Sequence, residues 1–187
     1  AVFGDTAIAV QKVGSQIESI SWMTADGFSA ALSSFIAQNH GAGNFERTKR
    51  GFRSAFTIMV CWGIFTSLLL IFAAAPIFRI FIREPEALPL GVDYLVILGF
   101  SQLFCCIEIM VGGAFSGFGK TLPPSITSIV LTSARIPMAM VLSATALGLN
   151  GVWWSITISS ILKGTVLLTL FLLFLRRETR RRQEQRV

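Results

Sequence analysis

Charged residues, cysteine and histidine are all scarce in this sequence. Only 14% of its 187 residues are charged, whereas about 25% of a soluble domain is charged. The three cysteines, Cys61, Cys105 and Cys106, lie in apolar segments without a C-x-x-C spacing, and the one histidine, His40, lies in a polar loop. These deficits argue against a disulfide framework, a Cys/His metal site and a Ser/His/Asp arrangement, so we expect the protein not to be an enzyme.

Basic residues are not distributed over a surface in the way that nucleic-acid binding requires. The net charge is +6, but six arginines fall within the last twelve residues. Elsewhere the sequence has no basic face with interleaved aromatic side chains. We therefore expect no nucleic-acid partner.

Long apolar runs make up most of the chain. The sequence is 53% hydrophobic with a mean hydropathy of +0.68, and its charges are clustered. Five largely apolar segments are each long enough to cross a hydrocarbon core of about 30 Å. The sequence therefore predicts an all-α, polytopic membrane helix bundle in a lipid bilayer, with five spans at about 5–38, 53–78, 90–118, 123–147 and 152–175.

The lysines and arginines between these spans alternate between the two sides. Eleven lie on the side that holds the GAG loop at 41–43 and the basic tail at 176–187, and two, Arg79 and Arg83, lie on the other. By the positive-inside rule the GAG loop and the C-terminus should be cytoplasmic, in a plasma (inner) membrane. Five spans that begin outside also predict a further helix upstream, in a larger protein.

The first span carries two acids at membrane depth, Glu18 and Asp26. A helical period puts both on one arc of about 100° with polar neighbours, namely Gln11, Ser15, Ser19, Ser29 and Ser33. A carboxylate costs about 3 kcal/mol or more at the bilayer centre, so it should face a bundle interior or a wet cavity. Three alternatives stay open: Glu18 pairs with Lys12 or Lys163, Asp26 relieves a kink near Gly27, or this is a long soluble amphipathic helix.

Polar stripes also mark the third and fourth spans. The third has Glu108 on a face of small residues that Gln102 adjoins, with Ser101, Cys105 and Gly112. The fourth has Arg135 on a face with Ser125, Ser128 and Thr132. We expect Arg135 to pair with one of the three acids as a structural or switching pair.

Three buried acids give a physical basis for ion exchange, because a buried carboxyl group can hold either a proton or a cation. Glu18, Asp26 and Glu108 are therefore the candidate coupling residues. The candidate cavity-lining residues share polar side chains on the same faces: Gln11, Ser15, Ser29, Gln102, Ser128, Thr132 and Arg135. Gly113 and Gly117 form a G-x-x-x-G, which predicts close helix packing.

Several stretches together resemble the multidrug and toxic compound extrusion (MATE) family. They are QNHGAG before a basic helix, then GAFSGFGKTLPPSI, then LGLNGVWWS, in the family's order and over nearly the whole chain. The resemblance is to helices eight to twelve of twelve, the C-terminal lobe without its first helix. Asp26 departs from the family, in which many members have proline near this position.

The resemblance implies a cation-coupled antiporter that exports organic cations or drugs together with an N-terminal lobe. It implies no cofactor, with sodium or a proton as the coupling ion, and sodium could be held at Glu18, Asp26 or Glu108. A lipid-linked oligosaccharide flippase of the same superfamily is the alternative, although it would need a cationic cavity, whereas the inward charges here are balanced. A non-transporting membrane scaffold or enzyme subunit would not need three buried acids.

Overall fold

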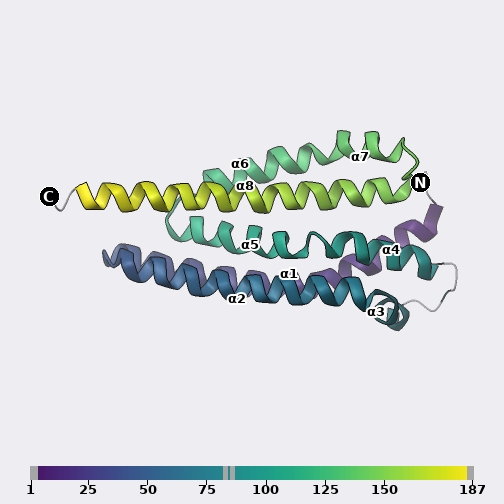
Figure 1. The fold of residues 1–187 in the computed structure, drawn as a ribbon, viewed down its shortest axis with the longest axis horizontal. Coiled ribbons are helices and arrows are strands. Elements are labelled where there is room, and N and C mark those ends of the chain that lie inside the picture. The colour runs from purple at the N-terminus through teal and green to yellow at the C-terminus, as the bar shows by residue number, and fades with distance from the viewer. Residues whose placement is uncertain (1–3, 82–83, 85–86, 185–187) are drawn as a thin grey trace.

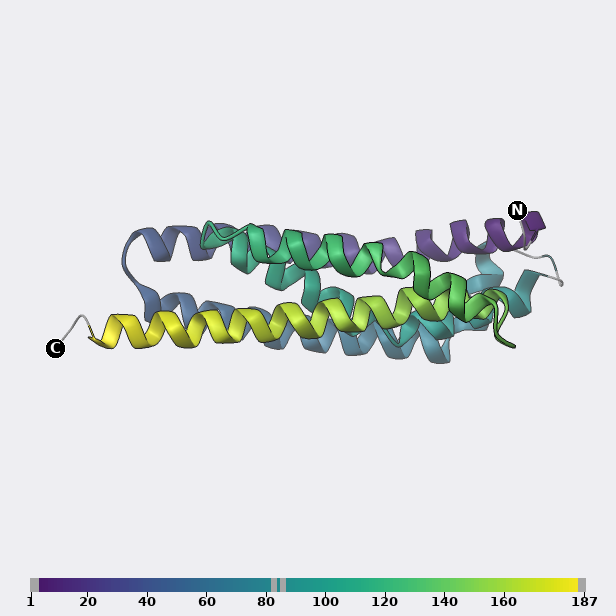
Figure 2. The same cartoon turned by 90° about the horizontal axis from the view of Figure 1, so that it is seen from above.

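The computed structural model describes residues 4–81, 84 and 87–184, and these residues form helices joined by turns (Figure 1). The helices are α1 (Gly4–Gly41), α2 (Phe45–Phe72), α3 (Ala74–Phe81), α4 (Ala87–Gly99), α5 (Gln102–Gly117), α6 (Leu122–Ser133), α7 (Arg135–Ser143) and α8 (Leu149–Glu184). Figures 1 and 2 both show an elongated bundle with the C-terminus, the α1–α2 turn and the α5–α6 turn at one end. The three basic segments therefore lie at the same end of the molecule.

The predicted segments overlap these helices, although α2 begins at Phe45 and three of the segments are interrupted. The first predicted segment corresponds to α1, the second to α2 and α3, the third to α4 and α5, and the fourth to α6 and α7. The fifth continues as helix α8 through Arg176 to Glu184, so the described part of the basic tail is helical. Among the described residues, the three helical segments α2, α6–α7 and α8 are long and apolar enough to cross a membrane, and the bent α4–α5 pair is a fourth if its two helices form one span. Helix α1 is not among these candidates because it carries several polar side chains. That α1 crosses the membrane therefore stays a prediction.

The break between α4 and α5 bends the third segment by 49°. A broken helix frees backbone groups that need new partners at membrane depth. Thr157 of α8 donates a hydrogen bond to the Ile97 carbonyl at 2.9 Å, and the Leu103 amide donates to Ser67 of α2 at 3.3 Å. Hydroxyl groups of the neighbouring helices therefore stabilise the break. The fourth segment is interrupted at Ala134, beside Pro137, whose ring crowds the carbonyl four residues earlier.

Helix α5 lies at the centre of the bundle and contacts α1, α2 and α8. Its C-terminal half belongs to an aromatic cluster in which the Phe171 ring lies 4.5 Å from that of Phe52 and 5.0 Å from that of Phe115. A second cluster, at the other end, contains Tyr94 and Trp153 with ring centroids 5.3 Å apart. The polar residues between these clusters are therefore held on well-packed helices.

The G-x-x-x-G of α5 allows α1 to approach closely, as the sequence predicts. A Cβ built on Gly113 would lie 2.6 Å from the Ser29 carbonyl oxygen, and one on Gly117 would lie 2.6 Å from that of Ser33. Both contacts are to backbone atoms, which cannot rotate away. On the other side of α5, a Cβ built on Gly164 of α8 would lie 2.5 Å from the Phe104 carbonyl oxygen. Small residues thus set the distance between α5 and its neighbours.

We predict that Gly113→Ala lowers the thermal stability of the purified protein, whereas Gly112→Ala does not. The added methyl group at Gly113 overpacks the α1–α5 contact, at a cost of about 1–3 kcal/mol. Gly112 is the matched control, because a Cβ there meets no described atom within 4 Å and alanine favours the helix. Thermal unfolding of both variants in detergent is the measurement. Equal melting temperatures for the two variants would contradict the close contact.

Candidate functional site

Two cavities run along the bundle and share Glu108 and Ile109 in their walls. The larger, of about 590 Å³, is lined by side chains of α1, α5, α6 and α8, including Asp26, Ser29, Ser33, Glu108, Pro124 and Ser128. The smaller, of about 360 Å³, lies between α1, α4, α5, α7 and α8, and its polar lining includes Gln11, Ser15, Glu18, Glu108, Arg135 and Lys163. Glu108 is the acid common to both cavities.

Glu108 forms an ion pair with Lys163 of α8, with 2.9 Å between Oε1 and Nζ. The two side chains are 17% and 11% exposed, so the pair is largely removed from solvent. A buried pair of this kind compensates the cost of bringing each charge into the bundle. The sequence left Lys163 as one partner considered for Glu18, and the structure assigns it to Glu108.

The prediction that Arg135 pairs with an acid is wrong. Its Nη2 donates a hydrogen bond to the hydroxyl group of Ser160 at 3.5 Å, and its Nε is buried without a partner among the described residues. The reason is the placement of α7, which packs against α8. Lys163, which lies nearly one turn along α8 from Ser160, is the cation that reaches Glu108.

Glu18 is bound by neutral donors. Its carboxylate accepts a hydrogen bond from the hydroxyl group of Tyr94 at 3.0 Å and one from Gln102 Nε2 at 3.5 Å. The side-chain oxygen Oε1 of Gln102 in turn accepts a hydrogen bond from the Trp22 indole N–H at 3.2 Å. Glu18 is 2% exposed and has no ion pair within the described part of the chain, so neither Lys12 nor Lys163 pairs with it. These hydrogen bonds join α1, α4 and α5.

The other predicted residues divide between the cavities. Gln11 and Ser15 line the smaller cavity, and Asp26 and Ser29 line the larger one together with Ser128. Asp26 is exposed, unlike Glu18, although both belong to the predicted acidic arc of α1. Thr132 is exposed and lines neither cavity, and Gln102 is fully buried in the hydrogen-bonded network of Glu18.

Sequence reasoning missed the roles of Tyr94, Trp22 and Ser160. A signal for α8 was available, because Ser155, Ser159 and Lys163 recur every four residues and Ser160 adjoins them. Tyr94 is the only tyrosine of the chain, but its place opposite Glu18 depends on how α4 packs against α1. No group of three or more His, Cys, Asp or Glu side chains able to hold a metal ion occurs in the ranges 4–81, 84 and 87–184.

Comparison with known proteins places this bundle in a family. The sequence profile of the family described as MatE matches residues 1–141. The chain belongs to the MatE family. This family assignment agrees with the sequence-based resemblance, and the family is one of membrane transporters rather than of enzymes.

Relatives of this MatE chain include named multidrug transporters. It is 31% identical over 173 residues to the probable multidrug resistance protein NorM of Thermotoga maritima, covering 91% of this chain and 37% of that protein. It is 24% identical over 169 residues to multidrug and toxin extrusion protein 1 of Homo sapiens, covering 89% of this chain and 30% of that protein. The chain thus spans about a third of the length of these relatives.

Solved structures of MATE transporters share the fold. The Vibrio cholerae MATE transporter VcmN in the bent form superposes with a TM-score of 0.85 at 20% identity, over 95% of this chain and 40% of that one. An inward-facing MATE family transporter of the MOP superfamily gives a TM-score of 0.84 at 19% identity, over 92% and 40% of the two chains. Together with the family match, these structures confirm an all-helical membrane bundle of the MATE type.

We predict that Lys163→Met destabilises this MatE chain more than the double variant Glu108→Gln/Lys163→Met does. The single change leaves a carboxylate in the bundle without its cation, which costs about 3–5 kcal/mol for a buried pair. The double change removes both charges and should regain most of that loss. Thermal unfolding in detergent measures both, with Lys120→Met as the exposed control. A double variant as unstable as Lys163→Met would show that the pair does not compensate the two charges.

Proposed function

We propose that this chain is the C-terminal lobe of a cation-coupled antiporter that exports organic cations or drugs in exchange for sodium or protons. The observation that carries the proposal is Glu108, an acid at membrane depth that lies in the walls of both cavities and is held by one lysine. A charged side chain inside a membrane bundle is costly, which makes it a functional candidate.

The pairing of Glu108 with Lys163 supports exchange between cations. The carboxylate is compensated by one ammonium group at 2.9 Å, so an incoming cation competes with Lys163 for the same negative charge. Binding of one cation to Glu108 therefore lowers the affinity of this site for another cation. Such competition at a midplane site is the physical requirement for antiport.

Glu18 and Asp26 supply the remaining negative charge. Tyr94 and Gln102 are neutral, so the Glu18 carboxylate needs a proton or a cation to offset its charge in the bundle. Asp26 and Glu108 line the larger cavity, and no lysine or arginine among the residues that the structure describes lines it. This excess of negative charge favours a positively charged organic substrate, and Ser29 and Ser128 offer hydroxyl groups to orient it.

The length of the chain supports its place in a two-lobe transporter. It covers 37% of the Thermotoga maritima relative and about 40% of the solved transporters, which leaves room for a first helix of this lobe and for an N-terminal lobe. We propose residues 1–175 as the lobe and 176–187 as the cytoplasmic tail, in a plasma (inner) membrane. The positive-inside rule supports this orientation, because the basic segments gather at one end (Figure 2).

The flippase alternative has less support. A pyrophosphate-linked substrate would favour a cavity lined by cations. The smaller cavity holds Arg135 and Lys163 against Glu18 and Glu108, and the charged side chains that line the larger one, within the described ranges, are the acids Asp26 and Glu108. A scaffold without transport activity would not need these acids in the walls of two cavities.

We predict that Glu108→Gln in the complete transporter abolishes cation-driven efflux per folded molecule, although it leaves Lys163 without its anion and therefore lowers stability. The amide keeps the shape of the side chain but can neither exchange a proton nor balance a cation. Glu18→Gln should also lower the rate, but less, because Asp26 stays on the same helix. Efflux of a fluorescent organic cation from proteoliposomes, under an imposed proton or sodium gradient, measures the effect. Asp93→Asn is the control, since it removes one exposed acid outside both cavities.

The arms of this experiment separate the remaining alternatives. Dependence on only one of the two gradients identifies the coupling ion. One relative, 24% identical over 163 residues, is named an FAD transporter of Shewanella oneidensis, so the substrate panel includes a flavin nucleotide. Parental efflux by Glu108→Gln would make its carboxylate structural. Transport of the flavin but of no organic cation would overturn the proposed substrate class.

A further inference from the structure

A groove of about 720 Å³ opens between α2 and α8 at the basic end of the bundle, and it shares no lining residue with either cavity described above. Four cations line it, Lys49 and Arg53 from α2 and Arg176 and Arg180 from α8. The two residues of each pair are four positions apart, so they lie on the same face of their helix, one turn from each other. The two pairs lie on either side of one groove.

The floor of this groove is apolar. Phe52, Leu172 and Leu175 line it together with the four cations. Nearer the middle of the bundle than the cations, the outer faces of both helices carry exposed apolar side chains. Examples are Ile58 of α2 and Leu172 of α8, which are 48% and 43% exposed. Each helix therefore passes from apolar to cationic within about one turn, as it would where acyl chains give way to lipid head groups.

The cations of the groove are only partly neutralised by acids of the chain. Lys49 pairs with Glu46 at 2.6 Å and Arg180 with Glu184 at 3.1 Å, and both acids are more than 60% exposed. Exposed pairs of this kind contribute little and exchange readily. Arg53 and Arg176 take part in no ion pair with any described residue. The groove therefore keeps a positive field that an anion can enter.

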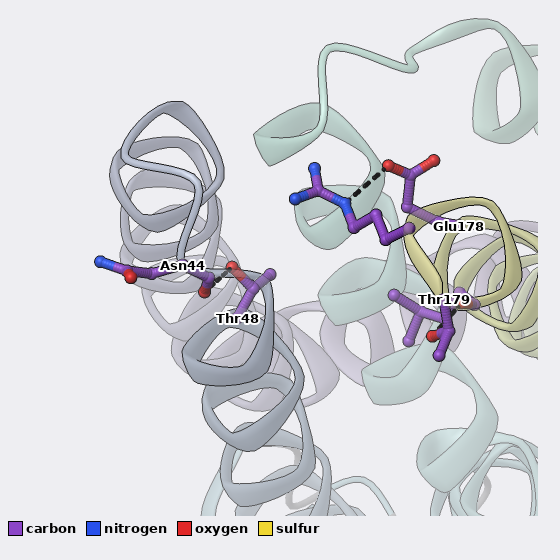
Figure 3. Close-up of polar contacts among 6 residues, drawn as sticks. Asn44, Thr48, Glu178 and Thr179 are labelled. Carbon is purple, nitrogen blue, oxygen red and sulfur yellow. Dashed lines mark hydrogen bonds and ion pairs between the residues drawn. The ribbon is translucent and has the colours of Figure 1, made fainter. Parts of the chain in front are cut away.

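Polar groups around the groove could orient a head group. Gln183 and Thr179 of α8 lie in its wall. Thr179 also lines a second pocket with Glu46 and Lys49 of α2. Figure 3 shows Thr179 on α8 and, on α2, the hydrogen bond that the Thr48 hydroxyl group donates to the Asn44 carbonyl. The Thr179 hydroxyl group donates to the Leu175 carbonyl at 2.8 Å, so its oxygen still accepts. A phosphate bearing a hydroxylated head group would find both cations and a hydrogen-bond acceptor here.

We propose that this groove binds an anionic phospholipid of the surrounding leaflet, with its phosphate between Arg53 and Arg176 and an acyl chain along Phe52 and Leu172. Basic pockets between membrane helices recognise anionic head groups through this combination of charge and apolar surface. The site is independent of the transported substrate and requires only that the bundle lies in a membrane.

The test is lipid binding to the purified complete transporter, measured by native mass spectrometry with phosphatidylglycerol and with phosphatidylcholine of identical acyl chains. We expect the parent to hold phosphatidylglycerol more tightly. Arg53→Gln/Arg176→Gln should weaken phosphatidylglycerol binding about thirtyfold, since each of the two basic residues near an anionic lipid contributes about 1 kcal/mol. Phosphatidylcholine binding should change little.

Two matched variants make the result specific. Arg50→Gln/Arg181→Gln removes the same charge from the same two helices outside this groove, and it should keep the parental affinity. Arg53→Lys/Arg176→Lys keeps the charge and should retain most of the binding, which separates lost charge from misfolding. Equal loss in the two glutamine variants would show non-specific attraction and overturn the site. Equal binding of the two lipids by the parent would overturn it as well, and displacement by inorganic phosphate alone would identify a free anion as the ligand instead.

Discussion

Charge compensation at membrane depth is the constraint on which this bundle depends. Glu108 and Lys163 meet across α5 and α8, and Glu18 meets Tyr94 and Gln102 across α1, α4 and α5. The 49° break between α4 and α5 falls between Tyr94 and Gln102, so it lets one bent segment bring two donors to one carboxylate. Without these contacts the acids would remain in a low-dielectric interior without partners, at a cost that packing alone would have to offset.

Close backbone approach makes these contacts geometrically feasible. Gly113 lets α1 lie against α5, and Gly164 does the same for α8, so polar side chains from three helices come within bonding distance. The cavities form beside these contacts, where α6 and α7 pack against α8 rather than against α1. The same features that bury the acids therefore leave space beside them, which is what an ion and a substrate need.

The sequence was sufficient to predict the helical bundle and the acid-bearing segments, because hydropathy and a 3.6-residue period depend only on local order. The polar character of the helix faces around Glu18 and Glu108 followed from the same period. Partner choice was not predictable: Arg135 and Lys163 are both cations on polar faces, and only the rotation of α7 and α8 decides which reaches Glu108. Asp26 shares an arc with Glu18, yet Asp26 is exposed and Glu18 is buried. The exposure of each acid therefore also depends on tertiary packing.

The central claim is that an acid of this lobe exchanges a coupling ion for an organic cation. Its most direct measurement is ion release: an organic cation is added to the purified transporter in weakly buffered detergent, with a pH-sensitive dye or bound radioactive sodium as the readout. The account predicts that binding of the organic cation releases protons or sodium, and that Glu108→Gln abolishes this release. Binding of the organic cation without release of either ion would contradict it.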